Sequence, residues 1–283
     1  MDHFYIVTNI HKDKEALVTK AVAAYLSNAG KKVSLPEKMP GFGEDVREED
    51  IPAGVDCILV LGGDGTLLGT ARSLVNLQIP MFGINLGRLG YLAEVDRSTY
   101  PLALDHLIRN DFVIEERMML KGSLFRNGHL VTEEVALNDI VISRKEGLKL
   151  ICLHNYVNDA FLTSYWADGM IISTPTGSTG YSMSVGGPIV SPDAALFLLT
   201  PMAAHTLNTR SIVLPPEAAI TLELGADRNG EQDHAMAYFD GIGAAPLQTG
   251  DRLVIRRYEK NTLLAKIHNS SFLEVLSKKM STN

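Results

Sequence analysis

Cysteine, basic clusters and long apolar runs are scarce in this sequence, and each scarcity excludes a class of protein. The 283 residues include 2 cysteines, Cys57 and Cys152, both in apolar runs, which excludes a disulfide framework and a cysteine zinc site. Lysine and arginine number 26 against 33 acidic residues, a net charge of −7 without a basic cluster. We therefore expect neither nucleic acid nor an anionic membrane surface as a partner.

No apolar run approaches the length of a membrane span, and the N-terminus shows no basic segment followed by an apolar signal region. The hydrophobic fraction of 46% and the charged fraction of 21% are typical of globular domains. These features predict a cytoplasmic protein with no membrane partner.

The first third of the chain alternates short apolar runs with segments of helical periodicity. The expected strands cover 4–9, 32–35, 55–61 and 80–84, and the expected helices cover 13–28, 66–77 and 99–109. Such alternation predicts an α/β domain with a Rossmann-like, doubly wound parallel sheet, whose ligands bind at the carboxyl ends of the strands. We place this domain at residues 1–112.

From residue 113 the pattern changes to short strands separated by turns. Asn127-Gly128 is the dipeptide most typical of a tight hairpin, and Asp240-Gly241 is one of several turn sequences that separate further expected strands. The pattern predicts an all-β, β-sandwich-like C-terminal domain over 113–270. A terminal helix within 271–283 can fold back on either domain, the first included.

Residues 55–70 carry the clearest functional signal. A buried apolar strand breaks at Gly62-Gly63-Asp64-Gly65, and helical spacing follows. A strand, a glycine turn and a helix together expose backbone N–H groups toward a phosphate. The spacing matches neither the Walker pattern, whose lysine is missing, nor the dinucleotide fingerprint. The alternative is a structural turn in which Asp64 or Thr66 caps the helix.

Two further segments support a ligand site. A second glycine cluster, residues 83–90, follows the neighbouring strand, so the two clusters predict one shared phosphate-facing crevice. Residues 173–184 are dense in serine and threonine and include Tyr181. Hydroxyl donors and a stacking ring suit phosphates, ribose hydroxyls and an aromatic base. A polar loop rich in turns is the alternative for this segment.

Taken together, the motifs resemble those of the bacterial NAD kinases. The resemblance rests on 62–66 (Gly-Gly-Asp-Gly-Thr), 83–85 with Gly87 and Gly90, Asn138-Asp139, Asp168-Gly169, 174–181 (Thr-Pro-Thr-Gly-Ser-Thr-Gly-Tyr) and 186–188 (Gly-Gly-Pro). It extends in the same order along nearly the whole chain, to His205 and Arg210. The glycine turn is shared with lipid kinases, whereas the 174–181 segment is far more specific.

The resemblance implies that ATP, as co-substrate, phosphorylates the 2′-hydroxyl of the adenosine ribose of NAD to give NADP. It further implies Asp64 as the general base, a divalent metal such as Mg²⁺ with no residue assigned to it, and a homodimer or homotetramer. The implied phosphate loop is Gly62, Gly63, Gly65 and Thr66. The implied NAD contacts are Asp64, Gly65, Asn138, Asp139, Asp168, Thr179, Gly180, Tyr181, Ser182 and Ser184, with Lys149 and Trp166 aligned more loosely and His205 and Arg210 as further possibilities.

Two residues depart from the family pattern. Gly180 replaces the usual alanine, which loosens the backbone, and Ile242 stands where the family often has glutamine after Asp-Gly. The amide contact of that glutamine does not carry over to Ile242.

Two alternatives from other classes stay open at this stage. A lipid kinase would use the same glycine turn but needs an apolar substrate pocket, against which the hydroxyl-rich 173–184 segment argues. A dinucleotide-binding sensor would bind without turnover, against which Asp64 argues. The sequence also leaves open whether the donor is ATP or polyphosphate, and whether the acceptor is NAD or NADH.

Overall fold

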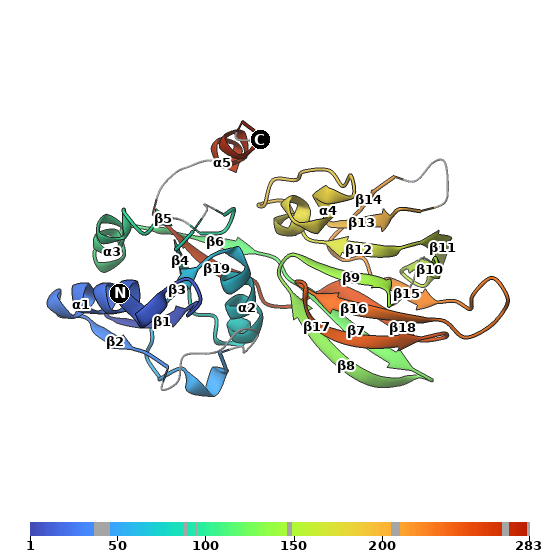
Figure 1. The fold of residues 1–283 in the computed structure, drawn as a ribbon, viewed down its shortest axis with the longest axis horizontal. Coiled ribbons are helices and arrows are strands. Elements are labelled where there is room, and N and C mark those ends of the chain that lie inside the picture. Colours follow the sequence, from blue (N-terminus) through green and yellow to red (C-terminus); the bar gives the residue numbers. More distant parts are fainter. Residues whose placement is uncertain are drawn as a thin grey trace. The chain divides into compact units, whose positions relative to one another are not determined.

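A computed structural model of the chain describes residues 1–36, 46–87, 90–93, 95–145, 149–204, 210–267 and 272–281. Its internal contacts divide the chain into two units, Met1–Arg117 with Lys260–Asn283 and Met118–Glu259. The first unit is α/β and the second is built from antiparallel sheets (Figure 1), so the predicted fold class is confirmed. No helix of the described residues is long and apolar enough to cross a membrane.

The first unit is organised around one sheet with the strand order β2-β1-β3-β4-β19-β6, and β5 pairs with β4. Its strands are β1 (His3–Thr8), β2 (Lys32–Ser34), β3 (Cys57–Gly62), β4 (Met81–Asn85), β5 (Val95–Asp96), β6 (Val113–Arg117) and β19 (Thr262–Lys266). Its helices are α1 (Leu17–Asn28), α2 (Asp64–Leu74), α3 (Tyr100–Ile108) and α5 (Phe272–Met280), with short 3₁₀ segments at Lys14–Ala16, Glu48–Asp50 and Val75–Leu77.

Burial explains the centre of this sheet. Every residue of β1, β3 and β4 is buried, as expected for parallel strands that are covered on both faces. Phe4, Leu59 and Phe82 from these strands pack in one cluster with Val22 and Leu26 of α1. The parallel strands therefore end at one edge of the sheet, where their glycine-rich loops begin.

The domain boundaries expected from the sequence, 112 and 270, differ from the contact-based boundaries at 117 and 260. The reason is a long-range pairing, because β19 lies between β4 and β6 and pairs with both. In addition, Lys279 of α5 places its ammonium nitrogen 4.1 Å from the centroid of the Tyr91 ring. The C-terminal segment thus belongs by its contacts to the first unit.

The second unit contains two six-stranded sheets, β11-β10-β15-β18-β7-β8 and β14-β13-β12-β9-β16-β17. The strands of the first of these are β7 (Leu120–Arg126), β8 (His129–Ala136), β10 (Ile151–Val157), β11 (Ala160–Ala167), β15 (Ile220–Leu224) and β18 (Arg252–Arg257). Those of the other are β9 (Asp139–Arg144), β12 (Gly169–Ser173), β13 (Phe197–Met202), β14 (Ile212–Leu214), β16 (His234–Phe239) and β17 (Ile242–Gln248). A 3₁₀ turn (Thr176–Thr179) and α4 (Tyr181–Ser184) follow β12.

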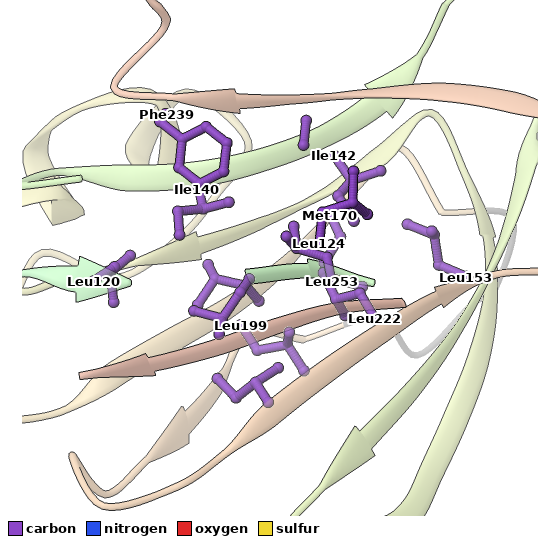
Figure 2. Close-up of a cluster of buried hydrophobic side chains, with 14 of the residues drawn as sticks. Leu120, Leu124, Ile140, Ile142, Leu153, Met170, Leu199, Leu222, Phe239 and Leu253 are labelled. Carbon is purple, nitrogen blue, oxygen red and sulfur yellow. The ribbon is translucent and has the colours of Figure 1, made fainter. Parts of the chain in front are cut away.

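The two sheets share a hydrophobic core (Figure 2). Leu124 and Leu253 from one sheet pack in the same cluster as Ile142 and Met170 from the other. Each of these side chains is fully buried, and along β7 buried positions alternate with more exposed ones. This is the period of a strand with one face on a core, and it makes the unit a β-sandwich.

The predicted hairpin turn at Asn127-Gly128 has the expected backbone, and the turn at Asp240-Gly241 has the same kind of backbone. Asn127 and Gly128 have φ angles of 50° and 79° between β7 and β8, and Asp240 and Gly241 have 52° and 72° between β16 and β17. Two consecutive residues with positive φ are the mark of the type I′ turn, whose twist matches the strands. Sequence reasoning overlooked the hairpin turn at Asn158-Asp159 between β10 and β11, where both residues also have positive φ.

Candidate active site

The first glycine loop joins β3 to α2. Gly62 ends the strand, Gly63 precedes the helix, and Asp64 is the first helical residue. A Cβ on Gly62 would lie 2.3 Å from Thr66 Oγ1, so only glycine leaves room for the first turn of α2 to lie this close. No side chain caps the N-terminus of α2, which leaves its positive end accessible to an anion.

Asp64 bonds to the second glycine loop rather than to its own helix. The backbone N–H groups of Tyr91 and Leu92 donate to Asp64 Oδ2 and Oδ1 at 2.7 and 3.2 Å. A Cβ on Gly90 would lie 1.8 Å from Asp64 Oδ1, so this glycine makes space for the carboxylate. The two loops therefore meet at one carboxylate, and the structural alternative of Asp64 as a helix cap is not what the structure shows.

The second loop begins at Asn85, the last residue of β4. Asn85 Oδ1 accepts the backbone N–H of Gly87 at 2.8 Å, and Leu86 N–H donates to the Gly62 carbonyl at 2.8 Å. Residues 88 and 89, which the sequence placed in this glycine cluster, lie outside the described residues. One backbone hydrogen bond thus joins the start of the second loop to the end of β3, the strand that precedes the first loop.

Lys12 is a residue near the glycine loops that sequence reasoning missed. A Cβ on Gly63 would lie 2.6 Å from Lys12 Nζ, and one on Gly87 would lie 3.7 Å from it. A single lysine in a polar segment matches no motif, and only the fold brings it from the turn after β1 to both glycine loops.

A pocket of about 460 Å³ lies in the second unit. It is lined by Asn138, Asp139, Val141, Ser143, Tyr181, Tyr238, Asp240 and Gly241. Asp139 is 5% exposed, whereas Tyr181 at the start of α4 is 45% exposed. The pocket combines a buried carboxylate, an amide and two aromatic rings, which are groups that can bind a ribose and a base.

Asp240 holds the Asn138-Asp139 turn in place. Its Oδ2 accepts the N–H of Leu137 at 2.7 Å, and its Oδ1 accepts those of Asn138 and Asp139 at 2.7 and 3.1 Å. Asn138 Oδ1 is buried without a hydrogen-bond partner. An unpaired buried acceptor costs free energy unless a ligand or water supplies a donor, so this amide is suited to recognise a ligand.

Two carboxylates close together change the acidity of Asp139. Burial, and after it the negative charge of Asp240, raise the pKa of Asp139 to about 7, although the hydrogen bond from the backbone N–H of Tyr181 lowers it. The Asp139 carboxyl therefore changes its charge near neutral pH.

Many hydroxyls of the 173–184 segment point inward rather than toward a ligand. Thr174 Oγ1 donates to the Leu137 carbonyl at 2.6 Å, and Ser178 Oγ exchanges hydrogen bonds with the backbone of Val190. A Cβ on Gly177 would lie 2.1 Å from the Asn138 carbonyl oxygen. These contacts tie the segment to the Asn138-Asp139 turn and so position Tyr181 at the pocket.

Three of the residues aligned with NAD contacts have partners of their own. Lys149 forms an ion pair with Asp227, and Arg144 Nη1 lies 3.2 Å from Asp168 Oδ1. The Arg228 guanidinium lies 5.2 Å from the centroid of the Trp166 ring. None of the three lines the described pocket. Arg210 is exposed after β13, and His205 lies outside the described residues.

Comparisons with known proteins agree with the motifs. The model of the ATP-NAD kinase N-terminal domain matches residues 4–112, and that of the ATP-NAD kinase C-terminal domain matches residues 137–267. The chain belongs to the ATP-NAD kinase family. The resemblance predicted from the motifs is thereby confirmed.

Relatives within this family match the kinase over almost its full length. An NAD kinase of Agathobacter rectalis is 45% identical over 282 residues, which are 99% of each chain. An NAD kinase of Lachnospira eligens is 39% identical over 99% of this chain and 100% of its own.

Solved structures of the family have the same fold as the kinase. Yeast NADH kinase, crystallised with NADH, superimposes with a TM-score of 0.85 at 24% identity, over 100% of this chain and 88% of its own. An NAD kinase from Archaeoglobus fulgidus, crystallised with ATP, gives a TM-score of 0.78 at 24% identity and covers 99% of each chain. At this level of identity the likeness shows the fold.

Proposed function

We propose that this ATP-dependent NAD kinase transfers the γ-phosphoryl group of ATP to the 2′-hydroxyl of the adenosine ribose, with Asp64 as the general base. The observation that carries this assignment is the fixed carboxylate of Asp64, which two backbone N–H groups hold at the uncapped end of α2. A carboxylate held between two glycine loops has a fixed orientation, and proton transfer to a general base needs a positioned acceptor.

The proton step follows from the chemistry of an alcohol. A ribose hydroxyl attacks phosphorus only if its proton is removed as the P–O bond forms, and an aligned carboxylate accelerates such a step about 10²–10⁴-fold. Each oxygen of Asp64 accepts one backbone N–H and keeps a further lone pair for the ribose proton.

The phosphoryl group needs positive charge around it while it moves. The proposed phosphate loop consists of Gly62, Gly63, Gly65 and Thr66, where the N-terminal end of α2 has no side-chain cap. Backbone dipoles that are fixed before the reaction stabilise developing charge without further reorganisation.

We assign the binding of NAD to the residues that the family pattern indicates. They are Asp64, Gly65, Asn138, Asp139, Lys149, Trp166, Asp168, Thr179, Gly180, Tyr181, Ser182 and Ser184, with His205 and Arg210 as further contacts. The 460 Å³ pocket supports the assignment for Asn138, Asp139 and Tyr181, which line it. There the unpaired Asn138 oxygen suits a donor on a base edge, and the Asp139 carboxylate suits ribose hydroxyls.

A divalent cation is part of the proposed reaction as the partner of ATP. Within the described residues no group of three or more histidine, cysteine, aspartate or glutamate side chains could hold a metal. We therefore propose that the ion binds together with ATP, since Mg²⁺ is often held by substrate phosphates and one or two carboxylates. The ion would neutralise phosphate charge, and Asp64 is the carboxylate at the loop that could contact it.

The location and the oligomeric state are also proposals. Cys57 and Cys152 are unpaired and buried, which fits a reducing cytoplasm. A homodimer or homotetramer stays a prediction from the family resemblance.

The experiment is a coupled assay on the purified protein with Mg²⁺ATP and either NAD or NADH, followed by ³¹P NMR of the product. We expect a 2′-phosphate, no turnover after EDTA treatment, and full recovery with added Mg²⁺. Phosphorylation of a diacylglycerol instead of NAD would favour the lipid kinase. Binding of NAD without product in a single turnover with labelled ATP would favour the sensor.

A further inference from the structure

The ammonium group of Lys12 lies beside the two glycine loops of the first unit. It is close enough to the Cα atoms of Gly63 and Gly87 that a Cβ on either residue would lie 2.6 or 3.7 Å from Nζ. Gly63 has φ −140° and ψ −172°, an extended backbone that any residue can adopt. The absence of a side chain at position 63 therefore makes room for the ammonium group and is not required by the backbone.

The turn that carries Lys12 is tied to the phosphate loop by Asn9. Asn9 Oδ1 accepts the N–H of Lys12 at 3.3 Å, and the Asn9 carbonyl accepts the same N–H at 3.0 Å. The amide nitrogen of Asn9 donates to Thr66 Oγ1 in the first turn of α2 at 3.2 Å. One side chain thus connects the backbone of Lys12 with the helix that follows the glycine turn.

The charge of Lys12 is not neutralised by any carboxylate among the residues that the structure describes. Lys12 is exposed and forms no ion pair with any residue that the structure describes. The nearby Asp64 carboxylate accepts N–H groups of Tyr91 and Leu92 instead. In a protein of net charge −7, an ammonium beside two glycine loops that no described carboxylate pairs is suited to bind an anion.

We propose that Lys12 binds the polyphosphate chain of ATP, and this assignment rests on the proposed function of the glycine loop. The chain lacks the lysine of the Walker pattern, and Lys12 reaches the loop from the turn after β1. Its three N–H donors and its flexible stem can follow a phosphate group. Lys12 then supplies a full positive charge, whereas the backbone N–H groups of the loop carry only partial charges.

The first experiment compares Lys12→Ala with the matched control Lys14→Ala, since Lys14 is another exposed lysine of the same segment. We expect Lys12→Ala to weaken binding of the non-hydrolysable analogue of Mg²⁺ATP by about 10- to 100-fold, the range for a lost charged hydrogen bond. The KM for ATP should rise, the Kd for NAD should stay within twofold, and Lys12→Arg should restore part of the loss. Lys14→Ala should leave all constants unchanged.

A second experiment uses the space at Gly63. Gly63→Ala places a methyl group where it displaces the end of Lys12, which is flexible, so the melting temperature should hardly change. The substitution should weaken ATP binding in the wild-type background and much less in the Lys12→Ala background. Equal losses in both backgrounds would contradict a role of Lys12 through this contact.

The outcomes separate this inference from the proposed function. If the wild type phosphorylates NAD while Lys12→Ala binds ATP as well as Lys14→Ala does, only the role of Lys12 is overturned. An equal loss of NAD and ATP affinity in Lys12→Ala would overturn its assignment to the donor. A wild type that neither binds ATP nor phosphorylates NAD would overturn both.

Discussion

The two units present different kinds of groups at their candidate ligand sites. The first relies on backbone, because its loops are rich in glycine and no side chain caps the N-terminus of α2, with the Asp64 carboxylate and the Lys12 ammonium beside them. The second buries side chains, since Asp139 is 5% exposed and Asp240 accepts three consecutive N–H groups. Substitutions in the first unit should therefore change rate and donor binding, and those in the second should change acceptor binding and stability.

The largest effect is expected at Asp64. Asp64→Asn keeps the shape of the side chain but removes its ability to accept the ribose proton, so kcat should fall by at least about 10² while NAD still binds. Turnover by coupled assay and the Kd of NAD by calorimetry should be measured together.

Asp56→Asn is the matched control, because Asp56 also accepts two backbone N–H groups in the first unit, from Asp2 and His3. It should leave kcat unchanged. Turnover near the wild-type rate in Asp64→Asn would remove Asp64 from the chemistry and assign it to loop structure.

A second prediction concerns the pH dependence of stability in the second unit. Burial and the charge of Asp240 raise the folded-state pKa of Asp139 from its ordinary value of 3.8 to about 7, so the fold favours the protonated form. The contribution of Asp139 to the free energy of unfolding should be complete below about pH 4, fall as pH rises toward about 7, and be lost above it. The shift corresponds to a few kcal/mol at about 1.4 kcal/mol per pKa unit.

Asp139→Asn should flatten this slope in urea unfolding measured from pH 5 to pH 8. Asp159→Asn, at an exposed hairpin position, is the control and should keep the wild-type slope. If the wild type and Asp139→Asn show the same slope, then Asp139 does not titrate in this range.

Tyr181 tests the acceptor pocket more directly. If its ring stacks on an aromatic base, Tyr181→Ala should weaken NAD binding by about 1–3 kcal/mol, measured by calorimetry. Because Tyr181 is 45% exposed, the melting temperature should change little. Phe161→Ala, on the exposed edge strand β11, should not affect NAD binding. A large fall in melting temperature with an unchanged Kd would make Tyr181 a packing residue.

The smallest effect is expected at Ile242. This residue begins β17 beside the Asp240-Gly241 turn and is half-buried. Ile242→Gln should change the free energy of unfolding by less than about 1 kcal/mol and leave NAD binding equal or tighter. A loss of several kcal/mol in urea unfolding would show that Ile242 is a core residue with no bearing on the ligand.

Sequence patterns predicted those parts of the fold that depend on residues close together in the sequence. The strand, glycine turn and helix around Asp64 are visible in sixteen consecutive residues, and the dipeptides Asn127-Gly128 and Asp240-Gly241 mark real type I′ turns. The placement of β19 between β4 and β6 was not predictable in this way, because it joins strands that are far apart in the sequence.

The candidate site likewise has features that a motif predicts and features that depend on contacts between distant residues. Asp64 follows from its motif, but its hydrogen bonds to the second loop depend on how two strands align. No sequence motif marks Lys12 or the contacts of Asp240 with the 137–139 turn. In the sequence, the hydroxyls of Thr174 and Ser178 resemble ligand donors, but in the structure they bond to the backbone. The NAD contacts taken from the family pattern stay predictions.

The pairing of β19 has a consequence for synthesis on the ribosome. In the sheet of the first unit, β19 (residues 262–266) lies between β4 and β6. These residues are synthesised after the whole second unit. Until β19 is made, the part of β4 that does not pair with β5 has an open edge. An open strand edge is a site at which other chains can pair. The second unit, continuous from Met118 to Glu259, can complete its sandwich first, and the unit that begins the chain is the last to finish folding.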